Sequence, residues 1–92
     1  MKCISILIPT YNEEVSLPFL YEALISLMDN YTNYNWEILF INDGSTDSTL
    51  EIIKKLRTND DRINYVNLSR NFGKESAMLA GFDYVTGDCA II

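Results

Sequence analysis

Hydrophobic residues in this chain follow two alternating patterns: short, mostly apolar runs, and longer segments with apolar positions three or four residues apart. The short runs lie at 4–8, 36–41, 63–68 and 89–92. Runs of apolar and β-branched residues are typical of strands that are buried on both faces of a sheet. We therefore expect four strands at these positions.

The first of the longer segments, 16–29, carries its apolar residues on one helical face. Leu17, Leu20, Leu24 and Met28 fall three or four positions apart. This spacing is typical of an amphipathic helix that packs one face against a sheet. We expect a helix here, with these four side chains in the core.

A second helix is predicted to begin near Ser48. Glu51 follows three residues later, a spacing that fits a capping box, in which the hydroxyl and the carboxylate each accept a hydrogen bond from a free backbone N–H. Leu50, Ile53 and Leu56 lie on one stripe of this helix. We expect that stripe to be part of the core.

A third helix is predicted over 73–85, so strands and helices alternate along the chain. That alternation implies right-handed crossovers and a parallel sheet. The expected fold class is α/β, a Rossmann-like β-α-β-α-β-α-β arrangement in three α/β/α layers, with the strand order 3-2-1-4 of nucleotide-binding folds. Because the sequence stops inside its last strand, we expect residues 1–92 to be one portion of a longer protein.

Composition and charge narrow the functional classes. The 92 residues include 13 acidic and 7 basic side chains, for a net charge of −6. Such an acidic chain lacks the basic face that nucleic-acid binding requires, so no nucleic-acid partner is expected. The absence of histidine excludes histidine-based catalytic triads and histidine-ligated metals.

The two cysteines and the N-terminal run bear on where the protein works. Cys3 and Cys89 lack the C-x-x-C spacing of metal or redox sites, so we expect both to be small core residues in a reducing compartment. The first apolar run is shorter than a signal peptide or the ~20 residues of a membrane span. The chain as given is therefore expected to be cytoplasmic.

Polar residues cluster after each of the first three predicted strands, at 9–14, 42–47 and 69–74. In a parallel sheet of this type, ligands bind beyond the carboxyl ends of the strands. No G-x-G-x-x-G follows the first strand, and Gly73-Lys74 does not complete a Walker A loop. The spacing thus argues against a dinucleotide-dependent dehydrogenase and a P-loop NTPase.

Individual residues in these clusters suit a nucleotide. Tyr11 can stack on a planar base, and Asp43 can accept hydrogen bonds from an imide N–H or a ribose hydroxyl. Lys74 lies in the first turn of a predicted helix, where an anion would offset its unfavourable interaction with the helix dipole, and Arg70 is close by in sequence. The alternatives are a packing role for Tyr11, a turn or cap role for Asp43, and an ion pair between Lys74 and a neighbouring acid.

Taken together, these clusters resemble the family 2 glycosyltransferases of GT-A fold, most closely the polyprenyl-phosphate branch that includes bactoprenol glucosyltransferases and dolichol-phosphate mannose synthases. The likeness covers nearly the whole chain. Four collinear segments carry it: Ser5-Ile6-Leu7-Ile8-Pro9-Thr10-Tyr11-Asn12-Glu13-Glu14, Ile41-Asn42-Asp43-Gly44-Ser45-Thr46-Asp47, Leu68-Ser69-Arg70-Asn71-Phe72-Gly73-Lys74-Glu75, and Ala80-Gly81 with Thr86-Gly87-Asp88.

The resemblance implies specific roles at matching positions. It places a first set of residues around the nucleoside: Pro9, Tyr11, Glu13, Ile41 and Asp43. It places Arg70 and Lys74 toward the diphosphate. The family's Asp-x-Asp motif, which binds Mg²⁺ or Mn²⁺, is expected after Ile92, so no metal ligand and no catalytic residue is expected within this chain.

The resemblance also implies an activity. The longer protein would transfer a sugar, with inversion and with a divalent metal, from a UDP- or GDP-sugar to a polyprenyl phosphate at the cytoplasmic face of a membrane, held there by a C-terminal region. The isolated chain would be an inactive nucleotide-sugar-binding portion. Two alternatives are a saccharide hydroxyl acceptor in cell-surface polysaccharide synthesis and a non-catalytic nucleotide-binding module.

Overall fold

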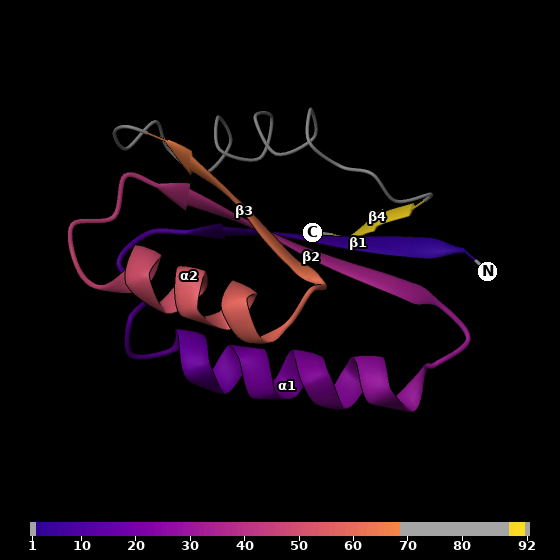
Figure 1. The fold of residues 1–92 in the computed structure, drawn as a ribbon. Coiled ribbons are helices and arrows are strands. Elements are labelled where there is room, and N and C mark those ends of the chain that lie inside the picture. The colour runs from indigo at the N-terminus through magenta and orange to yellow at the C-terminus, as the bar shows by residue number, and fades with distance from the viewer. Residues whose placement is uncertain (1, 69–88, 92) are drawn as a thin grey trace.

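The chain folds around one parallel sheet, in a computed structural model that describes residues 2–68 and 89–91. The sheet contains β1 (Cys3–Thr10), β2 (Asn35–Asp43), β3 (Ile63–Leu68) and β4 (Cys89–Ile91), in the order β3-β2-β1-β4 (Figure 1). All three strand pairs are parallel. The predicted α/β class and the 3-2-1-4 order are therefore confirmed.

Two strands extend further than their apolar runs predict. β1 includes Pro9 and Thr10, and β2 includes Asn42 and Asp43. These residues remain in the sheet because each has a partner in a neighbouring strand: Thr10 pairs with Asn42, and Asp43 pairs with Leu68. The polar residues at this edge are thus held by rigid strands before the loops begin.

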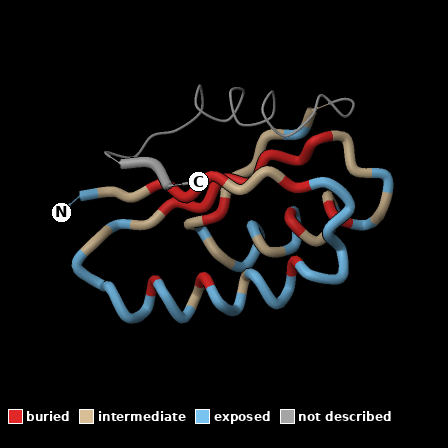
Figure 2. The backbone as a smooth tube through the Cα atoms, turned by 180° about the vertical axis from the view of Figure 1, so that it is seen from behind, coloured by how far each residue is buried: buried red, intermediate tan, exposed pale blue. Residues whose placement is uncertain are grey.

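Both described helices, α1 (Leu17–Asn30) and α2 (Thr49–Asn59), cover the same face of the sheet (Figure 1). The side chains buried between sheet and helices form the main core, and the buried positions of α1 face the sheet in Figure 2: Ile6, Leu17, Leu24, Met28, Ile38, Phe40, Ile53 and Ile63. Within the described part of the chain, no helix is long and apolar enough to cross a membrane. The predicted third helix, 73–85, lies outside the described residues.

One residue of the predicted α1 stripe is misplaced. Leu17, Leu24 and Met28 are buried as expected, whereas Leu20 is 37% exposed. Half-buried Tyr21 packs against the core next to Leu24 instead. The sheet-facing stripe therefore passes through position 21, and Leu20 lies at its edge.

The predicted capping box at the start of α2 is wrong. Ser48 occupies the N-cap position, but its side chain makes no capping hydrogen bond. The carboxylate of Asp47 takes that role, because Oδ1 accepts hydrogen bonds from the backbone N–H of Thr49, at 2.9 Å, and from the Thr49 hydroxyl. A charged carboxylate is a stronger acceptor than a hydroxyl and is favoured by the positive end of the helix dipole.

The opposite face of the sheet combines a small apolar cluster with a buried carboxylate. The apolar cluster consists of Leu7, Leu39 and Ile41, with Val66 and Leu68 packed against it. Buried Glu37 accepts hydrogen bonds from the Ser5 hydroxyl, at 2.9 Å, and from the Asn64 amide, at 3.2 Å. Cys3, expected in the core, is half-buried, and the Cys89 side chain lies outside the described residues.

A polar network joins α1 to the connection between α2 and β3. Asp60 accepts hydrogen bonds from the Tyr21 hydroxyl, at 2.9 Å, and from Arg62 Nε and Nη2, at 2.9 and 2.8 Å. Asp29 lies 3.9 Å from Arg62 Nη1. The Arg62 hydrogen bonds outweigh the effect of desolvation and lower the pKa of Asp60 to about 2.

This lowered pKa predicts a pH-dependent contribution to stability. A carboxyl group whose folded-state pKa lies below its unfolded value stabilises the fold above the unfolded pKa and loses that effect as the pH falls through the folded pKa. We expect Asp60→Asn to lower the free energy of unfolding by about 1–2 kcal/mol at pH 7, with this deficit shrinking between about pH 4 and pH 2. Urea unfolding of parent and variant at each pH measures the difference.

Asp61→Asn is the matched control, because Asp61 is the next residue, carries the same charge and is exposed. It should change the free energy of unfolding by less than about 0.5 kcal/mol at every pH. Equal effects of the two substitutions, or an Asp60→Asn deficit that does not vary with pH, would contradict the role assigned to the Asp60–Arg62 pair.

Candidate functional site

The carboxyl ends of β1 and β2 lie side by side, and the loops that follow them contact one another. The strand register pairs Pro9 with Ile41 and Thr10 with Asn42. The chain then leaves both strands at the same edge of the sheet, on the left in Figure 1. The first two predicted polar clusters therefore form one continuous surface.

A pocket of about 190 Å³ opens at this edge. The described residues that line it are Pro9, Thr10, Tyr11, Glu13 and Asp43. Asp43 is only 4% exposed, whereas Tyr11 is 42% exposed. The pocket thus combines a buried carboxylate with an accessible aromatic ring.

The structure brings together four of the seven residues that the sequence assigned to the site: Pro9, Tyr11, Glu13 and Asp43. Ile41 is not among the lining residues; it is fully buried in the cluster with Leu7 and Leu39. Because side chains alternate along a strand, Ile41 lies on the same face as Asp43 and supports it from within the sheet. Arg70 and Lys74 lie outside the described residues.

Thr10 is a pocket residue that the sequence reasoning missed. Its hydroxyl donates a hydrogen bond to the Ile41 carbonyl oxygen at 3.3 Å, which joins the ends of the two strands. Its only sequence signal was its position between Pro9 and Tyr11.

A second pocket, of about 220 Å³, lies between the end of β1 and the start of α1 and shares Pro9, Thr10 and Glu13 with the first. Its other lining residues are Ile8, Ser16, Leu17 and Leu20. The Glu13 carboxylate accepts a hydrogen bond from the Ser16 hydroxyl at 2.7 Å. The described lining of this second pocket includes neither an aromatic ring nor a second carboxylate, so the pocket of Tyr11 and Asp43 is the better binding site for a polar, planar ligand.

Asn12 joins the two loops behind this pocket. It adopts a left-handed backbone conformation, with φ of 53°. Its side-chain Oδ1 accepts hydrogen bonds from the backbone N–H groups of Thr46, at 2.8 Å, and Asp47, at 3.3 Å, and its own N–H donates to Ser45 Oγ at 3.0 Å. The segment that carries Tyr11 is therefore fixed to the segment that follows Asp43.

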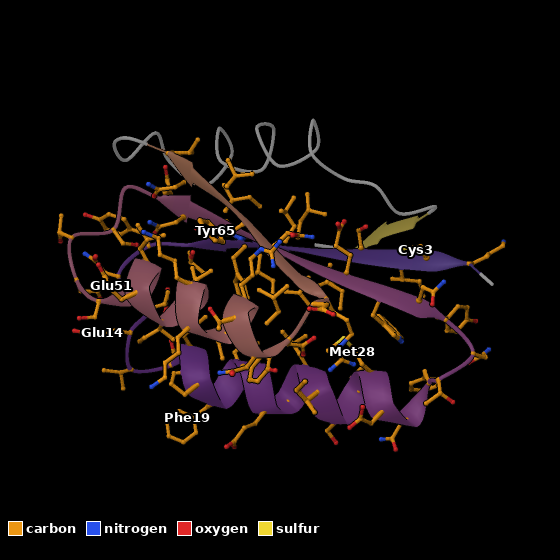
Figure 3. All side chains as sticks on the ribbon, in the orientation of Figure 1. Cys3, Glu14, Phe19, Met28, Glu51 and Tyr65 are labelled. Atoms are coloured by element: carbon orange, nitrogen blue, oxygen red, sulfur yellow. The ribbon has the colours of Figure 1, made fainter. Side chains whose placement is uncertain are left out.

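Further hydrogen bonds fasten the same loop to the start of α2. The Glu13 N–H donates to the Thr49 hydroxyl at 2.8 Å, and Glu14 exchanges hydrogen bonds with Asp47 and the Ser48 N–H (Glu14 is labelled in Figure 3). Desolvation would raise the pKa of Asp47, but hydrogen bonds from Thr49 and from the Glu14 N–H outweigh it and lower that pKa. Asp47 thus acts as an ionised structural acceptor, occupied by backbone and hydroxyl donors.

The amino-acid sequence identifies the protein family to which this chain belongs. Residues 5–92 match the family model described as Glycosyl transferase family 2. The chain belongs to glycosyltransferase family 2. Family membership accounts for the order and spacing of the strand-end clusters, and it confirms the resemblance drawn from those motifs.

Two relatives illustrate how much of a family 2 glycosyltransferase the chain represents. It is 48% identical over 89 residues to CsbB of Bacillus subtilis (strain 168), which is named as a glycosyltransferase, and the match covers 97% of this chain and 27% of CsbB. It is 42% identical over 88 residues to the prophage bactoprenol glucosyl transferase homolog of Escherichia coli (strain K12), covering 96% of this chain and 28% of that protein. The chain therefore spans little more than a quarter of these relatives.

Solved structures of glycosyltransferases share the fold. S. aureus TarS 1-349 in complex with UDP aligns over 98% of this chain and 26% of the TarS 1-349 chain, with 27% identity and a TM-score of 0.80. The mannosyltransferase PcManGT of Pyrobaculum calidifontis, solved with GDP-Man and Mn²⁺, aligns over 95% of this chain and 25% of that protein, with 21% identity and a TM-score of 0.71. The Rossmann-like arrangement of this family 2 chain is thus that of GT-A glycosyltransferases.

Metal ligands of the family were expected beyond Ile92. Among residues 2–68 and 89–91, no three cysteine or acidic side chains lie together as a group that could hold a metal ion. The carboxylates near the pocket are also engaged, Glu13 by the Ser16 hydroxyl and Asp47 by Thr49.

Proposed function

We propose that this chain supplies the nucleoside-binding part of an inverting glycosyltransferase, which transfers a sugar from a UDP- or GDP-sugar to a polyprenyl phosphate. The observation that carries the proposal is the pocket in which the Tyr11 ring and the Asp43 carboxylate lie together. Family membership supports the reaction class. A relative named as a bactoprenol glucosyl transferase homolog supports the lipid acceptor.

Each pocket residue suits one part of a nucleoside. The accessible ring of Tyr11 can stack on a pyrimidine or a purine, since both present a flat face. Buried Asp43 can accept hydrogen bonds from an imide N–H or from ribose hydroxyls, where a carboxylate gives a strong, charge-assisted bond. Pro9 and Thr10 line the pocket beside them. The site therefore selects for N–H and O–H donors rather than for anions.

The diphosphate requires a different surface. Glu13 and Asp43 both line the pocket, and their negative charges disfavour phosphate there. We propose that Arg70 and Lys74 extend the site toward the diphosphate, because they follow the neighbouring strand β3 in sequence. We also propose that residues of the longer protein would hold Mg²⁺ or Mn²⁺, which would supply positive charge beside the leaving nucleoside diphosphate.

The acceptor determines what further chemistry the longer protein needs. An oxygen of the polyprenyl phosphate attacks the anomeric carbon, the bond to the nucleoside diphosphate breaks, and its electron pair leaves with the diphosphate; a single displacement inverts the configuration. The attacking oxygen is already anionic near neutral pH, so positioning contributes more than a strong base. Because such a lipid resides in a membrane, we propose that the longer protein works at the cytoplasmic membrane face.

Nucleotide titration of Tyr11→Ala tests the pocket. We expect the parent chain to bind UDP or GDP weakly and Tyr11→Ala to bind it about 10-fold more weakly, because base–aromatic stacking contributes about 1–3 kcal/mol. Isothermal titration calorimetry measures both dissociation constants. Tyr31→Ala is the matched control: Tyr31 is 53% exposed, and its hydrogen bonds with Trp36 Nε1 and with the Met28 carbonyl use only its backbone.

Two results would overturn this proposal. One is a parent chain that binds neither UDP nor GDP at millimolar concentration. The other is a Tyr11→Ala variant whose affinity matches that of the parent and of Tyr31→Ala.

A further inference from the structure

Asn12 makes a set of hydrogen bonds that no pocket contact explains. It is not among the described residues that line the pocket, yet it follows Tyr11 directly in the chain. We propose that Asn12 is a positioning residue, which sets the distance between the Tyr11 ring and the Asp43 carboxylate. This inference rests on the proposed function, because it assigns Asn12 a role in nucleoside affinity at that same site.

The first step of the argument is the direction of the bonds. Asn12 Oδ1 accepts from the Thr46 N–H at 2.8 Å, from the Asp47 N–H at 3.3 Å and from the Thr46 hydroxyl at 3.4 Å. The Asn12 N–H donates to Ser45 Oγ at 3.0 Å. One residue of the first loop is therefore bonded to three consecutive residues of the second.

The second step is where these partners lie relative to Asp43. β2 ends at Asp43, and Gly44 follows with φ of 70°, which turns the chain sharply. Ser45, Thr46 and Asp47 come immediately after that turn. Holding these three residues in place also holds the end of β2. Ser45, which bonds to Asn12, is only two residues along the chain from Asp43, the carboxylate of the pocket.

The third step is the backbone of Asn12 itself. A left-handed conformation is unfavourable for most residues, and asparagine is one of the few apart from glycine that adopts it readily. Asn12 has φ of 53°, the chain bends at Tyr11 and Asn12, and the side chain of Asn12 bonds to the second loop while Tyr11 lines the pocket. Asparagine meets both requirements: the backbone conformation and a side-chain acceptor of the right length.

Other contacts between the loops do not replace this one. The Glu13 and Glu14 N–H groups bond to Thr49 and Asp47, at 2.8 and 3.4 Å, and so fasten the first loop to the start of α2. These bonds lie further from Tyr11 along the chain. Removing the Asn12 acceptor therefore loosens the pocket wall, while the backbone bond from the Asn12 N–H to Ser45 and the bonds of Glu13 and Glu14 remain.

Three substitutions separate conformation from hydrogen bonding. Asn12→Gly keeps the left-handed backbone accessible but removes the acceptor. Asn12→Ala removes the acceptor and disfavours the backbone conformation. Asn12→Asp keeps both an acceptor and a tolerance for that conformation, because aspartate resembles asparagine in both respects. If Asn12 acts through its Oδ1 atom, only Asn12→Asp retains its function.

Affinity for UDP and GDP is the first readout, measured by calorimetry in 0.5 M NaCl so that the added charge of Asn12→Asp is screened. For the nucleotide that the parent binds, we expect about 10-fold weaker binding by Asn12→Gly and Asn12→Ala, and binding within about threefold of the parent by Asn12→Asp. Circular dichroism should show all three variants folded. An Asn12→Gly variant that binds as tightly as the parent would overturn the proposal.

Amide hydrogen exchange is the second readout and does not depend on nucleotide. The Thr46 and Asp47 amides should exchange faster in Asn12→Gly and at the parental rate in Asn12→Asp, because these amides donate to residue 12. Unchanged exchange in Asn12→Gly would also overturn the proposal. If the parent binds neither nucleotide, the proposed function fails, and the exchange rates alone still decide whether Asn12 holds the loops together.

Discussion

Asp43→Asn should weaken the binding of UDP or GDP by about 10- to 100-fold, the largest expected effect of any pocket substitution described for this chain. A hydrogen bond to a charged group contributes about 1.5–3 kcal/mol, and more is lost when a mismatched group stays buried. Asp43 is 4% exposed and lines the pocket with Tyr11. The substituted amide would present a donor, Nδ2, where the nucleoside also presents donors.

The measurement is a calorimetric titration of parent and variant under identical conditions. Asp61→Asn is the matched control, because it removes one negative charge from an exposed residue outside the pocket. If repulsion between the acidic chain and the nucleotide dominated binding, both variants would bind more tightly than the parent. Asp43→Asn binding within twofold of the parent would contradict the role assigned to its carboxylate.

Strand positions were predictable wherever they depended on local composition. β3, Ile63–Leu68, has the predicted bounds, since polar turn residues precede it. The ends of β1 and β2 were not predictable in the same way, because Pro9 and Asn42 are favoured in turns and are held in the sheet by pairing with Ile41 and Thr10. Pairing between residues 32 apart depends on the assembled register, which local sequence does not contain.

Two predictions about the helices were wrong, for separate reasons. A spacing of three or four residues fits several adjacent stripes of a helix, so it did not distinguish Leu20 from Tyr21. Packing against the core and the hydrogen bond to Asp60 hold Tyr21 toward the sheet. The capping motif at Ser48 was plausible in isolation. Asp47, one residue earlier, offers a stronger acceptor and binds the first free N–H group of the helix, that of Thr49.

The candidate site also has parts that local sequence predicts and parts that depend on contacts between distant residues. Tyr11 and Asp43 were predictable because each lies within three residues of the end of an apolar run, and parallel strands bring their carboxyl ends to one edge. Asn12 was not identified as a positioning residue, although it stands within the segment that carries the family resemblance. Its partners lie 33 to 35 residues away, and the side chain's use of them depends on a left-handed backbone that no local pattern specified.

Phe40→Ala should cause the largest loss of stability, about 3–5 kcal/mol in the free energy of unfolding. Phe40 is 0% exposed, at the centre of the core between the sheet and both helices. In the register it lies between Ile8 of β1 and Tyr65 of β3, so a cavity there would loosen three strands at once. Domains of this size have total stabilities of only about 5–15 kcal/mol, so the variant should be close to unfolded at physiological temperature.

Phe19→Ala removes the same atoms from an exposed position. Phe19 is 72% exposed, and its ring points away from the sheet on the outer side of α1 (Figure 3). It should change the free energy of unfolding by less than about 0.5 kcal/mol in the same urea titration. Comparable losses in the two variants would mean that the sheet–helix core does not centre on Phe40. A large loss confined to Phe40→Ala would show that this core holds β2, and with it Asp43, in place.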